Sequence, residues 1–247
     1  MDFEAIREKV RNADIYRHQG KIEKIIGMTV EATGPECNIG DVCRIFRKGS
    51  EEFIYGEVVG FNEGKVMLMP YTDIEGIGPG SIVDNTGRQL EVNVGNALVG
   101  RIINAIGEPI DGKGPIKTTD RYSIVGEPVN PLTRPRIEDI IPFGVKAIDG
   151  LLTIGRGQRM GIFAGSGVGK STLLGMIARE VQADINVIAL VGERGREVLE
   201  FIERDLGEKG MARSVLVVAT SDQPAMMRNK CPMTATAIAE YFKDQGK

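Results

Sequence analysis

The sequence predicts two folded parts, a small β-barrel followed by an α/β domain that carries a phosphate-binding loop. Short β-rich runs separated by turn residues fill the region 21–94, and turns at such close, regular spacing are typical of a small closed barrel. From about residue 158, strand-like and helix-like stretches alternate, which predicts a sheet of parallel strands covered by helices. A glycine-rich loop lies at the first strand-to-helix junction of this second part. We expect the domain boundaries at 1–20 for an N-terminal segment, 21–95 for the barrel and 96–247 for the α/β domain.

Residues 2–13 have the pattern of a short amphipathic helix. Its apolar residues recur at helical spacing, with charged residues on the rest of the wheel: Phe3, Ile6, Val10 and Ala13. A helix of this length is marginally stable alone, so its apolar stripe must pack against something. The pattern leaves two alternatives open, packing on its own domain or binding of a partner protein.

Six runs within the barrel region have the composition of strands: 22–30, 42–46, 53–61, 66–70, 81–83 and 89–94. None of them carries a constellation of side chains suited to catalysis, so the barrel is expected to have a structural or assembly role.

A connector is predicted between the two domains, because residues 107–142 hold six of the eleven prolines. Beyond it we expect strands at 158–164, 185–191 and 214–219, and helices after the glycine-rich loop, over 196–208, and from 224 with a break at Cys231–Pro232. The second and third of these strands are continuously apolar, as buried parallel strands are.

The glycine-rich loop follows an apolar run and precedes a helix-like stretch, the context that a phosphate-binding P-loop requires. Glycines allow successive N–H groups to face phosphate oxygens. Lys170 would supply a positive charge to the β- and γ-phosphates, and the Ser171 hydroxyl is placed to hold Mg²⁺. The sequence therefore predicts a site for ATP with Mg²⁺, formed by Ala164, Gly165, Ser166, Gly167, Val168, Gly169, Lys170, Ser171 and Thr172. Ala164 stands where the general pattern has glycine.

A second group of polar residues, Glu193 and Arg194, follows the strand expected at 185–191. Ligands of open parallel sheets bind at the carboxyl ends of the strands. A glutamate there could act as a base for water in line with the γ-phosphate, and an arginine could anchor phosphate or pair across a subunit contact. The alternative is a charged loop that caps the next helix, with Glu197 in its first turn.

Composition excludes several other classes of function. The 31 basic and 34 acidic residues give a formal net charge of −3, so nucleic acid is not expected as the main partner. The single histidine, His18, excludes a multi-histidine metal site, and the spacings of the three cysteines fit no metal pattern. The apolar runs are too short to span a bilayer and the first residues lack the apolar core of a signal peptide. We therefore expect a cytosolic protein with reduced thiols.

Four segments together resemble the type III export ATPases, relatives of the catalytic subunit of rotary ATP synthases: 164–171, 192–197, 142–159 and 235–242. The resemblance covers nearly everything after Gly20 and implies a RecA-like domain of the rotary-ATPase type behind the barrel. It also implies a homohexameric ring with nucleotide sites between subunits. ATP hydrolysis would then energise protein export, with chaperones and export substrates as partners at a membrane-embedded gate. The protein would lie in the cytoplasm, peripherally at the inner face of the cell membrane.

Two features place the chain nearer the flagellar branch of that family than the virulence-secretion branch, which remains the alternative: residues 37–43 and 68–71. The rotary synthase β subunit usually has threonine where this chain has Gly195. The resemblance also implies that the N-terminal helix, through residues 1–13, binds a stator-like regulatory partner.

The same resemblance implies that the α/β domain is incomplete at its C-terminal end. The family's acidic residue for Mg²⁺, its adenine-stacking residue and its arginine finger would all lie beyond Lys247. Two hypotheses follow. In the first, the chain is the front portion of an export ATPase and is inactive alone; in the second, it is complete and binds nucleotide or a partner without hydrolysis.

Overall fold

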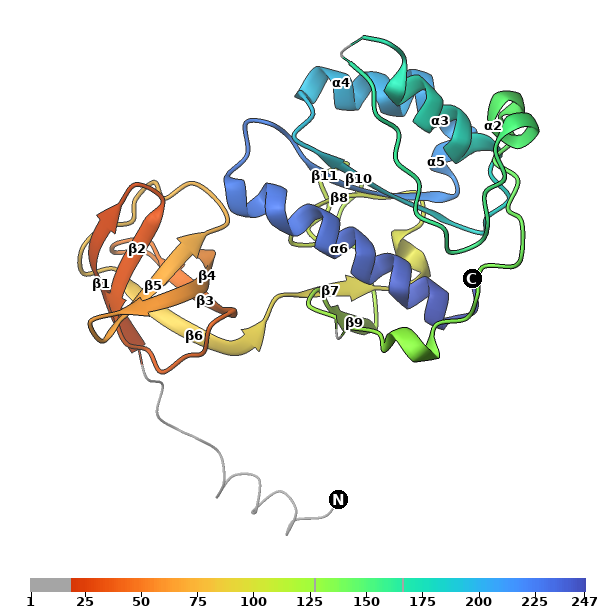
Figure 1. The fold of residues 1–247 in the computed structure, drawn as a ribbon. Helices are drawn as coiled ribbons and strands as arrows, with labels where there is room; N and C mark the ends of the chain where they lie inside the picture. The colour runs from red at the N-terminus through yellow and green to blue at the C-terminus, as the bar shows by residue number, and fades with distance from the viewer. Residues whose placement is uncertain (1–18, 127, 166) are drawn as a thin grey trace, which may run out of the picture. The chain divides into compact units, whose positions relative to one another are not determined.

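The computed structural model describes residues 19–126, 128–165 and 167–247. The chain divides into two compact units, which we call the barrel unit (up to Gln89) and the α/β unit (from Leu90) (Figure 1). The helix expected at 2–13 lies outside the described residues. None of the helices in the described ranges is both long and apolar enough to cross a membrane.

The barrel unit is a closed barrel with the strand order β1-β2-β5-β4-β3-β6. Every pairing between neighbouring strands is antiparallel, and closure leaves no unpaired edge. The predicted small barrel is thereby confirmed. The strands are β1 (Gln19–Ile26), β2 (Thr29–Thr33), β3 (Asp41–Phe46), β4 (Phe53–Asn62), β5 (Lys65–Pro70) and β6 (Ile82–Gln89).

Three strand predictions in the barrel differ from the structure. The run 81–83 is only the start of the longer strand β6 (Ile82–Gln89). The run 22–30 is a hairpin rather than one strand, because Gly27 adopts a positive φ of 59° between β1 and β2. The run 89–94 is outside the barrel. Its residues form β7 (Glu91–Val94), which pairs with β9 (Asp120–Ser123) in the α/β unit. Because β6 already pairs with both β1 and β3, the barrel is closed and offers no edge to a further strand.

Every second side chain along the strands points into the barrel, and these inward side chains fill its interior. In β5, buried and half-buried residues alternate strictly, and the inward residues of several strands form one apolar cluster: Ile22, Val30, Ala32, Cys43, Ile45, Ile54, Val58, Val66, Leu68 and Val83. Tyr71 is fully buried just after β5 and donates a hydrogen bond of 2.6 Å to the carboxylate of Glu57.

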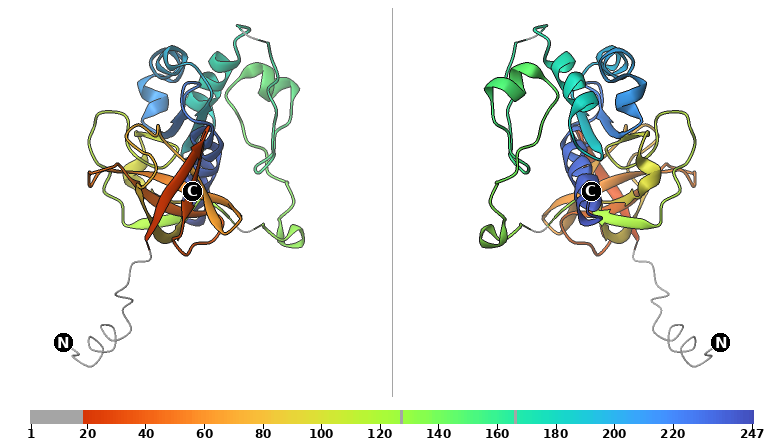
Figure 2. Two further views of the ribbon diagram at one scale, coloured as in Figure 1. Left: turned by 90° about the vertical axis from the view of Figure 1, so that its left-hand side faces the viewer. Right: turned by 90° about the vertical axis from the view of Figure 1, so that its right-hand side faces the viewer.

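The α/β unit contains a parallel sheet with the order β10-β11-β8. These strands are β8 (Ile102–Asn104), β10 (Asn186–Val191) and β11 (Ser214–Ala219), and every residue of β11 is buried. Figures 1 and 2 show helices on both sides of this sheet, with α3, α4 and α5 opposite α6. They are α2 (Lys146–Leu151), α3 (Lys170–Glu180), α4 (Gly195–Glu200), the π-helix η3 (Phe201–Leu206), α5 (Gly207–Met211) and α6 (Ala225–Asp244), with single 3-10 turns η1 (Asn96–Leu98) and η2 (Pro131–Thr133).

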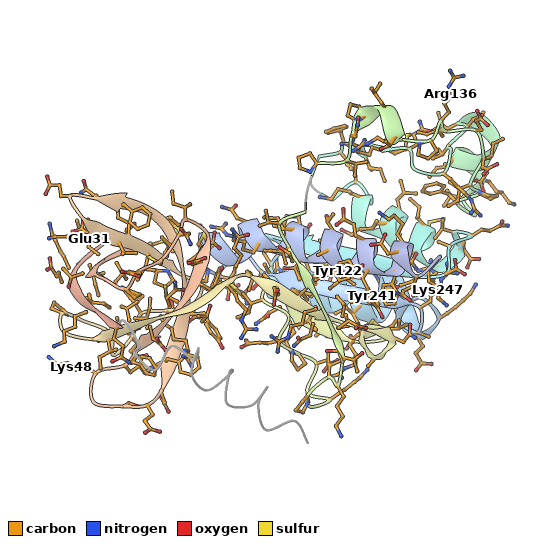
Figure 3. All side chains as sticks on the ribbon, turned by 90° about the horizontal axis from the view of Figure 1, so that it is seen from below. Glu31, Lys48, Tyr122, Arg136, Tyr241 and Lys247 are labelled. Carbon is orange, nitrogen blue, oxygen red and sulfur yellow. The ribbon has the colours of Figure 1, made fainter. Side chains whose placement is uncertain are left out.

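Helix α6 runs through Pro232, so the predicted break at Cys231–Pro232 is wrong. A proline inside a helix costs about 3 kcal/mol. The packing of α6 offsets this, since Cys231 is fully buried with its thiol 3.3 Å from the Val217 carbonyl of β11. Tyr241 of α6 also packs edge-on against Tyr122 of β9, with ring centroids 5.5 Å apart (Figure 3).

The strand expected at 158–164 is not formed, and these residues have no regular secondary structure. A strand needs a neighbour to pair its N–H and C=O groups, and no described strand pairs with this run. Phe163 is accordingly 97 % exposed. In the described residues of the connector 107–142, the only named elements are the short β9 and η2.

Candidate functional site

The glycine-rich loop turns directly into α3. Gly167 and Gly169 have φ angles of 77° and 94°, a backbone region that residues with a Cβ rarely adopt. Gly169 is the residue before the first helical turn, and its carbonyl accepts a hydrogen bond of 2.9 Å from the Leu173 N–H. Ser166 lies outside the described residues. The chain can turn here because glycine adopts these positive φ angles without the steric strain that a side chain would cause.

The first turn of α3 places the remaining predicted ligands. It begins at Lys170 and continues through Ser171 and Thr172. The N–H groups at a helix start have no intrahelical acceptor and carry the positive end of the helix dipole, so they favour an anion. Ala164, Gly165 and Val168 are exposed, so the loop is open to a ligand from solvent.

The loop after β10 presents the second predicted group. Gly192 has a positive φ of 72°, and its N–H donates a hydrogen bond of 2.7 Å to the Ala219 carbonyl at the end of β11. The next carbonyl, that of Glu193, accepts a hydrogen bond of 3.0 Å from the Ser221 N–H. The backbone of Glu193 is therefore fixed at the carboxyl edge of the sheet, where its side chain remains partly exposed.

Lys170 and Glu193 meet. The Lys170 ammonium lies 3.8 Å from a Glu193 carboxylate oxygen, and the two side chains are 52 % and 34 % exposed. An ion pair this long and this exposed contributes little to stability. Its two partners are therefore readily separated by a phosphate that competes for the lysine. The structure thus brings together two predicted residues that are 23 positions apart in the chain.

Arg194 lies apart from this pair. It is the residue before α4, and its guanidinium contacts the Glu197 carboxylate at 3.3 Å, one turn into that helix. The Arg194 side chain makes no capping hydrogen bond to α4, so the contact is a surface ion pair within the loop and the first turn of that helix. Among the contacts that the structure describes for Arg194, none is with a residue of the glycine-rich loop.

The donor set suits a Mg²⁺ ion that arrives with a nucleotide. No cluster of three or more His, Cys, Asp or Glu side chains in the described ranges could hold a metal ion. Mg²⁺ commonly binds one or two protein oxygens together with phosphates and waters, and the Ser171 hydroxyl on the first turn of α3 is such an oxygen. The fit is therefore to a nucleotide-borne ion and not to an all-protein cage.

Two cavities of the α/β unit lie away from these residues. One of about 390 Å³ is lined by Gly155, Ile185 and Phe242 among others, and one of about 500 Å³ by Lys113, Ile202 and Met211 among others. Neither includes a predicted site residue. A phosphate site made of backbone N–H groups on an exposed turn is shallow. The types of residue present therefore identify this site better than the presence of a cavity does.

One feature near the site was missed by sequence reasoning. Gly175, on the second turn of α3, packs against the backbone of Asp205 in η3. The only signal in the sequence was a glycine within a helical pattern, which can indicate a close approach, but its partner is 30 residues farther along.

Comparison with known families identifies both units. The model of the ATP synthase alpha/beta family, beta-barrel domain, matches residues 22–87, and the model of that family's nucleotide-binding domain matches 144–247. Together they cover more than half of the chain.

Individual relatives agree. A flagellum-specific ATP synthase of Bacillus subtilis is 54 % identical over 100 % of this chain and 57 % of its own length. A type 3 secretion system ATPase of Xanthomonas euvesicatoria is 46 % identical over 93 % of this chain and 52 % of its own. The solved structure of the assembled ATPase EscN, from the type III secretion system of enteropathogenic E. coli, matches with a TM-score of 0.83 at 46 % identity, over 92 % of this chain and 54 % of that one. The chain thus spans about half the length of the relatives it matches.

Proposed function

Because the chain belongs to the ATP synthase alpha/beta family, we propose that it supplies the phosphate-binding site of an ATPase that energises type III protein export for flagellum assembly. The observation that carries this proposal is the meeting of Lys170, at the start of α3, with Glu193, at the end of β10, 3.8 Å apart. Such a pair places a phosphate-binding cation beside a candidate base for water.

Hydrolysis would proceed from this geometry. The Lys170 ammonium and the N–H groups of the α3 first turn hold the β- and γ-phosphates, and the γ-phosphate draws the lysine away from Glu193. The Glu193 carboxylate then accepts a proton from a water as the water oxygen bonds to the γ-phosphorus and the bond to the leaving ADP oxygen breaks. The Ser171 hydroxyl would hold the Mg²⁺ that arrives with ATP, and that ion would supply charge to neutralise the phosphates. Arg194 is proposed to contribute only if it leaves Glu197.

The flagellar assignment rests on the relatives. Flagellum-specific ATP synthases of Bacillus subtilis and Borreliella burgdorferi are 54 % and 47 % identical to the chain, against 46 % for the Xanthomonas secretion ATPase. The second candidate is therefore the ATPase of a virulence type III secretion system, which would share the same site.

The proposed partners follow from the same relatives. EscN has been solved as an assembled ATPase and in complex with its central stalk EscO, which supports a homo-oligomer, and we propose that this oligomer is a hexameric ring. We also propose a stator-like regulatory protein bound by residues 1–13, export chaperones and substrates, and a cytoplasmic location at the inner face of the membrane beside the export gate.

The test is ATP hydrolysis by the full-length protein that contains this chain. Wild type should turn over ATP with Mg²⁺, Lys170→Ala should reduce the rate at least about a hundredfold, and Glu193→Gln about 10²- to 10⁴-fold with ATP still bound. Lys146→Ala, which removes an exposed lysine from α2, is the matched control and should be neutral. The isolated 247-residue chain should hydrolyse ATP negligibly.

A wild-type protein that binds ATP without turnover would refute the ATPase proposal and favour the non-hydrolysing alternative. Robust turnover by the isolated chain, lost in Lys170→Ala, would refute the expectation that essential groups lie beyond Lys247.

A further inference from the structure

Helix α3 and the π-helix η3 are in closer contact at Gly175 than any residue with a side chain would permit. A Cβ placed at position 175 would lie 2.7 Å from the backbone carbonyl carbon of Asp205 and 2.8 Å from the Asp205 Cβ. Ordinary contacts of a Cβ begin at about 3.4 Å. Backbone atoms cannot rotate away as a flexible side chain can, so a methyl group at Gly175 would push the two helices apart.

The partner element is unusual. Residues Phe201–Leu206 form a π-helix, a rare conformation that occurs mostly as single turns at functional sites. η3 continues from α4 without a break, and α4 begins two residues after Glu193. Asp205 is buried, and it lies beside Phe201 and Leu206, which belong to the apolar cluster beneath α3.

This contact joins the two halves of the candidate site. Lys170 belongs to the first turn of α3 and Gly175 to the second, so a rigid helix couples them. The run 158–164 that enters the loop pairs with no described strand. α3 is therefore positioned by its packing on η3 and by tethers at its far end, such as the 2.7 Å hydrogen bond from the Asn186 amide to the Ala178 carbonyl.

We propose that Gly175 is a positioning residue for ATP hydrolysis: its close packing on Asp205 sets the distance between Lys170 and Glu193. This inference rests on the function proposed above. Lys170 and the N–H groups of the first turn belong to α3 and move with it. Displacement of α3 therefore leaves the grip on phosphate intact, but it moves the bound γ-phosphate away from Glu193, whose backbone is held by the sheet.

The expected effect of Gly175→Ala is a split between binding and chemistry. Relieving the clash requires a shift of about 1 Å, and a misplacement of that size can cost about a hundredfold in rate. In the full-length protein kcat should fall about a hundredfold, while the Kd for ATP stays within about twofold of wild type. Gly150→Ala is the matched control, since a Cβ at that helical glycine of α2 meets nothing within 4 Å; it should leave both values unchanged.

A double variant distinguishes positioning from loss of folded protein. If Gly175→Ala acts by separating Glu193 from the phosphate, Glu193→Gln should reduce kcat far less in the Gly175→Ala protein than in wild type. Partial unfolding would instead leave the Glu193→Gln factor unchanged. Should Gly175→Ala not fold, Leu206→Val loosens the same interface more gently and should lower kcat with the Kd unchanged.

The inference is overturned if Gly175→Ala behaves as Gly150→Ala does, if Kd and kcat change together, or if the Glu193→Gln factor is the same in both backgrounds. Failure of the proposed function is distinguishable, because it appears in the wild-type protein as binding without turnover; the positioning role would fall with it.

Discussion

Asp111 is the group whose replacement should most clearly destabilise the α/β unit. Its carboxylate is 3 % exposed and accepts two hydrogen bonds from Arg101, of 2.6 and 2.8 Å. It also accepts hydrogen bonds from the backbone N–H groups of Ile102, at the start of β8, and of Lys113. This carboxylate therefore joins the edge strand of the sheet to the loop that follows it.

The substitution Asp111→Asn keeps the shape but replaces one accepting oxygen with a donating amide that faces the Arg101 guanidinium. Breaking a buried ion pair from one side costs about 3–5 kcal/mol. Because the Arg101 side chain is 14 % exposed and retains some access to water, we expect the lower end, a loss of about 3 kcal/mol in the free energy of unfolding. Asp139→Asn, at an exposed aspartate of the same unit, is the matched control and should change it by less than about 0.5 kcal/mol.

The pH dependence has a definite sign. The Arg101 guanidinium, with the N–H groups of Lys113 and Ile102, holds the pKa of Asp111 well below its usual range. In the unfolded chain that pKa returns to about 3.9. The stabilisation is therefore fully present above about pH 4 and is lost as the pH falls towards the folded-state pKa, because the unfolded state then binds the extra proton. The difference between wild type and Asp111→Asn should be constant from about pH 5 to 8 and shrink below about pH 4.

Urea unfolding followed by circular dichroism at 222 nm measures this difference. Among the described residues every α-helix belongs to the α/β unit, so the loss of helical signal follows mainly the unfolding of that unit. An unchanged urea midpoint in Asp111→Asn, or a difference that grows as the pH falls from 5 to 3, would refute the assignment of Asp111 as a buried stabilising partner of Arg101.

Two further predictions concern the barrel and the N-terminal segment. Tyr71→Phe removes the 2.6 Å hydrogen bond from a fully buried hydroxyl to the Glu57 carboxylate, and should destabilise the barrel unit by about 1.5–3 kcal/mol in urea unfolding. Tyr55→Phe on β4 is the control, and equal stability of the two variants would argue against this bond. Deletion of residues 1–13 should abolish binding of the regulatory partner in a pull-down while the Kd for ATP stays unchanged. An unchanged affinity for the partner would instead favour the alternative that this segment packs on its own domain.

Local patterns in the sequence were sufficient for much of the site. The glycines at 167 and 169 are required by a backbone that only glycine adopts easily. The glycine-rich loop and the helical pattern after it predicted Lys170 at a helix start, and the apolar run 185–191 predicted Glu193 just after a strand. Glu193 was expected near the phosphate because ligands bind at the carboxyl ends of parallel strands, although the run 158–164 that leads to Lys170 is not itself a strand.

The expectations that failed were those that depend on contacts between distant residues. The barrel is closed by β6, which pairs with both β1 and β3, and the composition of the run 89–94 cannot reveal that this closure leaves it outside. Whether Pro232 breaks α6 depends on how well that helix packs on the sheet. The run 158–164 has the composition of a strand but no described neighbour to pair with.

The sequence alone therefore determined most of the strands and helices and the glycine-rich turn before α3, because these depend on residues that are adjacent in the chain. Only the tertiary structure decided that Gly175 packs on Asp205 and that Cys231 of α6 packs on β11. Such choices are made by packing and electrostatic contacts between segments that come together only when the chain folds, and no local pattern encodes them.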